Sequence, residues 1–109
     1  MLAAIERTLE QGGEPDDVLR AAVESLAAEP GVAWAAVAFL EKGRLVVGPQ
    51  AGGADAARRT YVPVEFQGAT IGELWVDGEA DPALLARVAA LIAGHVLIGW
   101  DTGGEAWVP

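Results

Sequence analysis

The clearest hydrophobic pattern in the chain is a two-residue alternation between Tyr61 and Val76. One set of alternate positions is apolar: Val62, Val64, Phe66, Gly72, Leu74 and Val76. The other set is mixed in character: Tyr61, Pro63, Glu65, Ile71, Glu73 and Trp75. Gln67-Gly68 interrupts the alternation with a tight polar turn. A period of two on both sides of such a turn predicts an antiparallel hairpin whose two faces differ chemically.

Two further strands are predicted upstream of this hairpin. The segment from Val32 to Leu40 is apolar at both sets of alternate positions, as is typical of a central strand with both faces covered. After a hairpin turn at Glu41-Lys42-Gly43, we expect a shorter strand from Arg44 to Gly48 at the sheet edge. Pro49 to Ala57 is rich in glycine and alanine without periodicity, which predicts a loop.

Two helices are predicted before the first strand. The first spans residues 2–11, and its apolar face consists of Leu2, Ile5 and Leu9. It is too short to persist alone in water, so we expect it to dock on the rest of the chain. The second begins at Pro15, because proline suits the first helical position, and ends near Ala28 before Pro30-Gly31.

The last predicted helix begins with Asp81 as N-cap and Pro82 at its first position, and runs to about Gly99 or Trp100. It is apolar nearly all round, which indicates that more than one side is covered. One arc is rich in small side chains: Ala83, Ala86, Ala89, Ala90, Ala93 and Leu97. That arc permits close approach of a second helix, from the N-terminus or from a partner chain.

These elements predict an α+β fold. We expect a four- to five-stranded antiparallel sheet, in the order 2-1-4-3 for four strands, with the N- and C-terminal helices packed on one face. The chain is interpreted as a single domain over residues 1–109. Its parts are the N-terminal helices (1–29), the sheet (32–77), the C-terminal helix (81–100) and a tail (101–109).

The composition excludes several kinds of site and partner without identifying a function. The 109 residues carry a net charge of −9, which repels phosphate backbones, so we expect no nucleic-acid partner. There is no cysteine, which removes disulfides, thiolate metal sites and thiol catalysis. No apolar run reaches the roughly 20 residues of a membrane span, and the N-terminus lacks the pattern of a signal peptide. We therefore expect a cytoplasmic protein with no membrane partner.

The second half of the chain resembles the C-terminal half of a GAF domain. The resemblance rests on Val62-Pro63-Val64, Gly68, Ile71-Gly72-Glu73-Leu74-Trp75-Val76 and the helix introduced by Asp81-Pro82. In that family a Val-Pro-Leu-like strand precedes an Ile-Gly-Val-Leu-like strand and an Asp-led final helix. The resemblance covers most of the chain, from Pro15 to Gly99, and is compatible with the sequence outside these motifs.

The resemblance implies a ligand class only loosely. GAF domains bind cyclic nucleotides, tetrapyrroles or small metabolites, or no ligand. The cyclic-nucleotide Asn-Lys-X-Phe-Asp motif is missing here, and neither a bilin-attaching cysteine nor the cysteines of the free methionine sulfoxide reductase branch are present. GAF domains usually cover their pocket with helical segments and an extra strand. Only Pro49 to Thr60 takes that place here, which implies a pocket that is open or absent.

Candidate chemistry is sparse. His95 is the only histidine and lacks a second metal ligand at helical spacing, so we interpret it as a core residue and expect no metal or cofactor. Glu65 and Glu73 fall on the same face of the hairpin, where they are either solvated charges or a facing pair of catalytic carboxylates.

The best candidate ligand site is the less covered sheet face. Its residues are Trp34, Arg59, Tyr61, Glu73 and Trp75. The aromatic rings offer flat apolar contact, Glu73 a buried acceptor and Arg59 a charge at the rim. The alternative is that these aromatic side chains are ordinary core or contact a partner protein.

Three functions follow as hypotheses. The first is a non-enzymatic GAF-like sensory or regulatory domain that binds a small molecule and forms a homodimer through Leu2, Ile5, Leu9, Ala86, Ala90, Ala93 and Leu97. The second is a protein-interaction scaffold of the roadblock or profilin type, which uses the sheet face and the Trp107 tail and binds no small molecule. The third is a small enzyme that uses Glu65 and Glu73.

Overall fold

The architecture comes from a computed structural model, which describes Ile5, Arg7 and residues 15–107, with side chains described for Ile5, Arg7 and residues 17–96. The elements follow the order α2 (Pro15–Ala27), β1 (Val32–Glu41), β2 (Arg44–Gly52), the 3-10 turn η1 (Ala56–Arg58), β3 (Arg59–Phe66), β4 (Ala69–Gly78) and α3 (Pro82–Trp107). The predicted helix over residues 2–11 lies outside the described residues, except for Ile5 and Arg7, which are helical.

The strands form one antiparallel sheet in the order β2-β1-β4-β3. β1 pairs with β2 on one side and with β4 on the other, so the segment from Val32 to Leu40 lies inside the sheet. From Trp34 to Phe39 every β1 residue is buried, as a strand that is apolar at both sets of alternate positions requires. The predicted α+β fold and strand order are confirmed.

The two predicted turns, at Glu41-Lys42-Gly43 and at Gln67-Gly68, are both hairpin turns in the structure, although Glu41 belongs to β1. Gln67 and Gly68 link β3 to β4 with φ of 53° and 82°, and Lys42 and Gly43 link β1 to β2 with φ of 51° and 77°. Two-residue hairpin loops with positive φ at both positions match the right-handed twist of the strands. Glycine at the second position meets this requirement without a steric cost.

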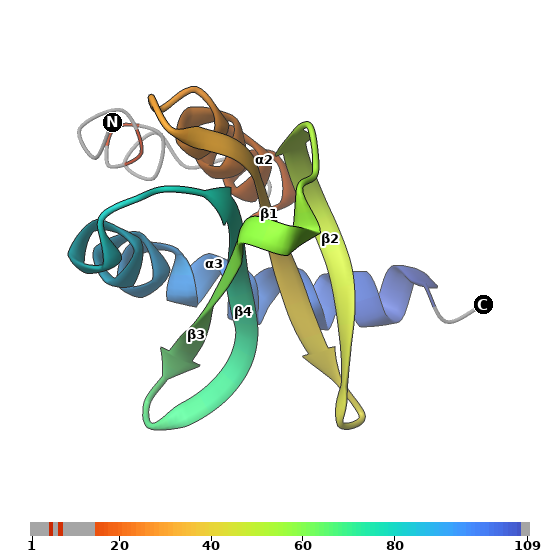
Figure 1. Cartoon of the computed structure of the whole chain (residues 1–109). Helices are drawn as coiled ribbons and strands as arrows, with labels where there is room; N and C mark the ends of the chain where they lie inside the picture. Colours follow the sequence, from red (N-terminus) through yellow and green to blue (C-terminus); the bar gives the residue numbers. More distant parts are fainter. Residues whose placement is uncertain (1–4, 6, 8–14, 108–109) are drawn as a thin grey trace.

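The core lies between the sheet and the two helices (Figure 1). It combines one set of alternate strand positions, including Val37, Phe39 and Leu74, with apolar side chains of α2 and α3. Figure 1 shows α2 and α3 together behind the sheet, so neither of them covers the opposite face. No helix among the described residues is long and apolar enough to cross a membrane.

Two boundaries differ from the sequence prediction. β2 continues to Gly52 rather than ending at Gly48, so the predicted loop starts later. A register shift between Ala36 and Ala38 absorbs one extra β2 residue near Gly48 and Pro49. Proline is tolerated there because β2 is an edge strand, and glycine is needed because a Cβ at position 48 would collide with the Phe39 ring.

α3 also continues beyond its predicted end, to Trp107 rather than Gly99 or Trp100. The segment 101–107 is therefore helical rather than an irregular tail. No proline occurs between Pro82 and Pro109, and glycine lowers helix propensity without blocking the helix.

Candidate functional site

The sheet face away from the helices is built from three rows of paired residues. Across β1, β4 and β3, the rows are Trp34, Asp77 and Arg59; Ala36, Trp75 and Tyr61; and Ala38, Glu73 and Pro63. Directly paired residues in an antiparallel sheet project to the same side, so these nine residues share one face. We refer to them together as the open face.

Asp77 is the most deeply buried polar group on the open face. Its side chain is 0% exposed, and it accepts hydrogen bonds from Arg59 Nε at 2.7 Å and from Arg59 Nη2 at 2.9 Å. Two parallel N–H donors to one carboxylate form the strong bidentate arrangement of guanidinium and carboxylate groups. The 16% exposed side chain of Arg59 is therefore oriented by Asp77 rather than by solvent.

The ion pair shifts the titration of both groups. The hydrogen bond from Arg59 lowers the pKa of Asp77 below its ordinary value, the Asp55 backbone N–H lowers it further, and burial acts in the opposite direction. The same bond raises the pKa of Arg59. Both groups are thus charged at neutral pH, and the pair is locally neutral.

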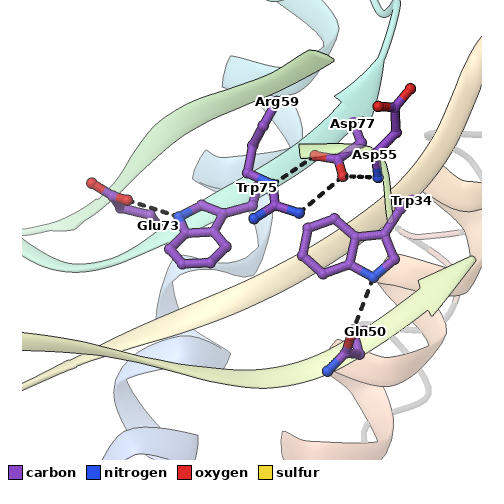
Figure 2. Close-up of polar contacts among 7 residues, drawn as sticks. All are labelled: Trp34, Gln50, Asp55, Arg59, Glu73, Trp75 and Asp77. Atoms are coloured by element: carbon purple, nitrogen blue, oxygen red, sulfur yellow. Dashed lines mark hydrogen bonds and ion pairs between the residues drawn. The ribbon is translucent and has the colours of Figure 1, made fainter. Parts of the chain in front are cut away.

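Two indole rings enclose the Arg59 guanidinium (Figure 2). Arg59 Cζ lies 4.3 Å from the Trp34 ring centroid and 5.4 Å from the Trp75 centroid, within the range of cation–π attraction. Tyr61 adds an edge contact to Trp75, with ring centroids 5.4 Å apart and planes at 82°. The result is a cluster of three aromatic rings around one cation.

Each indole N–H also has an acceptor. Trp34 Nε1 donates to Gln50 Oε1 at 3.2 Å, and Trp75 Nε1 donates to Glu73 Oε1 at 2.8 Å. These bonds fix the direction of both rings across the face (Figure 2). Tryptophan combines a large apolar body with one donor that needs a partner when buried, and both requirements are met here.

The segment over residues 53–58, which includes η1, crosses one end of the open face. The Asp55 backbone N–H donates to Asp77 Oδ2 at 2.6 Å, so the buried carboxylate also anchors this segment. Figure 1 shows η1 on the side of the sheet opposite α3. The predicted loop therefore covers part of the open face and leaves the row of Glu73 and Pro63 beyond it.

Comparison with known proteins adds information on the fold. No protein-family model matches the sequence, and no curated protein matches it. A type II free methionine-R-sulfoxide reductase from Thermoplasma acidophilum superposes with a TM-score of 0.68 at 21% identity, covering 77% of this chain and 92% of the reductase. The GAF domain of Acinetobacter phosphoenolpyruvate-protein phosphotransferase also gives 0.68 at 12% identity, covering 90% of this chain and 93% of that domain.

The fold is GAF-like. The family resemblance drawn from the hairpin and the Asp-led helix is confirmed at the level of fold. Identities of 21% and 12% show the fold alone, and function has to be argued from the site.

The expectation that the protein is not an enzyme is wrong as it was drawn. It rested on the lack of a catalytic constellation and of the cysteines of the reductase branch, yet a structure of the same fold is a methionine-R-sulfoxide reductase. One fold hosts both binding and catalytic sites, so the GAF-like fold gives no ground for excluding catalysis.

The GAF-like fold brings all five predicted ligand-site residues onto one face. Trp34, Tyr61, Glu73 and Trp75 lie there as expected, with Glu73 as a half-buried acceptor. Arg59 lies inside the cluster rather than at the rim where we expected it, because the indole rings and Asp77 contact its guanidinium. Whether this face binds a ligand stays a prediction.

Three groups of this site were not predicted from the sequence: Asp77, Gln50 and the backbone N–H of Asp55. Asp77 was treated as the end of the sheet, although it continues the alternation of Glu73 and Trp75 by one step. The period of two continues from Trp75 to Asp77 on one strand and from Tyr61 back to Arg59 on the other. Followed that far, it places both charges on one face of the sheet. Gln50 and Asp55 were missed because their contacts depend on two features that were not predicted. These are the full length of β2 and the path of residues 53–58.

Glu65 and Glu73 do not face each other. Pro63 lies opposite Glu73, and the register then shifts after Val64, so that Glu65 lies opposite Thr70. An extra β4 residue at Ile71 forms this bulge. The two carboxylates are therefore not cross-strand partners, and they do not form a facing catalytic pair.

The residues predicted for a dimer interface separate into distinct environments. Ile5 and Ala93 are 1% and 5% exposed and belong to the core of the same chain, so they present no surface to a partner. Ala86 and Ala90 are exposed, and they line a groove of about 380 Å³ between α3 and the edge strand β3. Leu2 and Leu9 lie outside the described residues, as does the side chain of Leu97.

Metal chemistry finds no support in the part of the chain that the structure describes. It contains no group of three or more His, Cys, Asp or Glu side chains placed to hold an ion. His95 is half-buried on α3 rather than fully enclosed in the core.

Proposed function

We propose that this GAF-like domain binds a small molecule on its open face and acts as a sensory or regulatory domain. The observation that supports the proposal is the cluster of Trp34, Trp75 and Tyr61 around the Arg59–Asp77 ion pair. A few convergent polar groups among aromatic walls are the usual composition of a small-molecule site.

A purely structural role explains this cluster less well. Removing two charges from water is costly, and replacing a buried ion pair with well-packed apolar side chains is often neutral or stabilising. The sheet already has a complete apolar core on its helix side. Maintaining an ion pair and two oriented indoles on the other side is better suited to recognition than to stability.

The solved neighbours are compatible with this proposal. The Thermoplasma acidophilum protein is a reductase of free methionine-R-sulfoxide, so a domain of the same fold acts on a small molecule. The likeness supports a ligand of similar scale on this chain, and it leaves the identity of that ligand open.

The test uses tryptophan fluorescence. The sequence has four tryptophans, so Trp100 and Trp107 are changed to Phe, leaving only Trp34 and Trp75 as reporters. We expect at least one compound of a metabolite library to change the fluorescence in a saturable way and to raise the melting temperature. The matched control is Trp34→Phe in the same background. A library without any saturable response would argue against the proposal.

A second candidate, a protein-interaction module, is favoured by a different observation. Leu45, Val46 and Val47 are 40%, 37% and 39% exposed on the edge strand β2. Consecutive exposed aliphatic residues on an open edge invite pairing with another chain. Under this alternative, Val47→Lys weakens partner binding, while library compounds leave the fluorescence of Trp34 and Trp75 unchanged.

The homodimer also belongs among the proposals. Ala86 and Ala90 are the described residues through which α3 would approach a second copy, beside the groove against β3. A stable dimer buries about 1,600 Å² in total, so these alanines need flanking contacts. Sedimentation at tens of micromolar tests the proposal, and a monomer at that concentration would count against it.

A further inference from the structure

The charges on the open face do not cancel. Arg59 and Asp77 neutralise each other in a bidentate pair. Glu73 is left over: its carboxylate is half-buried and accepts one hydrogen bond, from Trp75 Nε1 at 2.8 Å. No cation of the described chain lies within ion-pair distance of Glu73. The open face therefore carries one more carboxylate than it has cationic side chains.

Aromatic surface accompanies this carboxylate. Tyr61 is 57% exposed, and its ring contacts Trp75, the residue that donates to Glu73. Tyr61 lies opposite Trp75 in the register, and Glu73 and Pro63 form the next row of the sheet. A cation placed there meets the face of an aromatic ring on one side and a carboxylate on the other, and both attract it.

The chain already shows that this face holds a cation. The Arg59 guanidinium lies against two indole rings with a carboxylate at its base (Figure 2). The row of Tyr61, Trp75 and Glu73 offers the same combination of aromatic ring and carboxylate. It differs in that Glu73 forms no ion pair with any described side chain, although Arg59 also contacts the Trp75 ring.

An anionic ligand fits this face poorly. Arg59 commits Nε and Nη2 to Asp77, so its charge is already compensated. A phosphate or carboxylate would approach Glu73 without a free cation to balance it, on a molecule whose net charge is −9. Nucleotides and other phosphate esters are therefore disfavoured on electrostatic grounds.

From these contacts we infer that the ligand of the open face carries a cationic group, an alkylammonium or a guanidinium, which binds between the Tyr61 ring and the Glu73 carboxylate. This inference rests on the proposed function, because it names the chemical class of the ligand of that same site. Glu73 supplies the charge, Tyr61 the exposed aromatic face, and the Trp75 N–H orients the carboxylate.

The experiment compares probes of equal shape and different charge. The chain with Trp34 and Trp75 as its only tryptophans is titrated at constant ionic strength with choline, its neutral analogue 3,3-dimethyl-1-butanol, agmatine and 3,3-dimethylbutanoate. We expect saturable fluorescence changes with choline or agmatine. The neutral analogue should bind about tenfold more weakly, as cation–π and carboxylate attraction are lost, and the anion should not bind.

The decisive variant is Glu73→Gln. It removes the charge while the amide oxygen still accepts the Trp75 N–H, and a thermal melt checks that the variant folds. Affinity for the cationic probe should fall about tenfold. Glu65→Gln is the matched control, since Glu65 is an exposed carboxylate of the same hairpin that lies opposite Thr70. It changes the net charge equally and should leave the affinity unchanged.

The outcomes separate the inference from the proposed function. If neutral or anionic library compounds bind and cationic probes do not, or if Glu73→Gln and Glu65→Gln behave alike, the inference is overturned and the small-molecule site stands. If neither the probes nor the library give a saturable response, the proposed function fails and the inference fails with it.

Discussion

At the scale of single residues, Asp77 joins β4 to both β3 and the crossing segment. It accepts two bonds from β3 through Arg59 and one from the crossing segment through the Asp55 backbone. Arg59 in turn contacts both indole rings. One carboxylate thus fixes the position of a cation, two aromatic rings and a loop.

We predict that Asp77→Asn destabilises the fold by about 2 kcal/mol, because Arg59 then loses its counter-charge and donates to a neutral amide. Urea unfolding measures the change. Asp55→Asn is the control: its side chain makes only a surface contact with Arg58 at 3.9 Å, and its effect should stay below about 0.5 kcal/mol. Equal losses in the two variants would contradict the assigned role of Asp77.

Asp77 also makes the stability of the fold depend on pH. The pKa of Asp77 is lower in the folded chain than in the unfolded chain, so between these two values the unfolded state binds more protons. The stability from Asp77 is therefore complete above about pH 4, the ordinary aspartate value, and is lost as pH falls through the folded pKa. Unfolding free energies measured from pH 3 to pH 7 should fall less steeply below pH 4 in Asp77→Asn than in the wild type.

At the scale of elements, glycines inside β4 and α3 have opposite roles. A Cβ on Gly72 would collide with the Ala38 carbonyl oxygen of the neighbouring strand, whereas a Cβ on Gly94 meets nothing within 4 Å. Gly72 therefore permits the close pairing of β1 and β4. Gly94 lies inside α3, where alanine has the higher helix propensity.

We predict that Gly94→Ala raises the unfolding free energy by roughly 0.5–1 kcal/mol and that Gly72→Ala lowers it by more than about 1 kcal/mol. Thermal melts of the two variants provide the comparison, and each serves as the control for the other. A destabilised Gly94→Ala variant would mean that α3 packs against something at this position, such as a partner chain.

The elements that could be predicted from the sequence are those with a strong local pattern. Alternation across Gln67-Gly68 predicted the hairpin, and an apolar run without a polar face placed β1 inside the sheet. The parts that were missed depend on tertiary contacts. Gly48 and Pro49 continue β2 through a bulge that Phe39 makes necessary, and Asp77 gains its role only when Arg59 lies opposite it.

At the scale of the whole molecule, the sheet has two unlike faces. The helix side is a conventional apolar core, while the open face combines aromatic rings with an ion pair and one uncompensated carboxylate. The exposed aliphatic residues of β2 lie at one edge of the sheet, where β1 separates them from β4, and the groove beside α3 adjoins the open face at Pro63. The proposed small-molecule site on β3 and β4 and the alternative protein-binding edge on β2 are thus at different places on one GAF-like domain.

Because the open face and the β2 edge can be observed separately, one measurement tests the proposed ligand site most directly. In nitrogen-15 correlation spectra, the indole N–H signals of Trp34 and Trp75 report the open face, and the amide signals of Val46 and Val47 report the β2 edge. On addition of the strongest-binding library compound, we predict saturable shifts of both indole signals with the Val46 and Val47 amides unchanged. Shifts confined to the β2 amides, with both indole signals fixed, would contradict the claim that the open face is the ligand site.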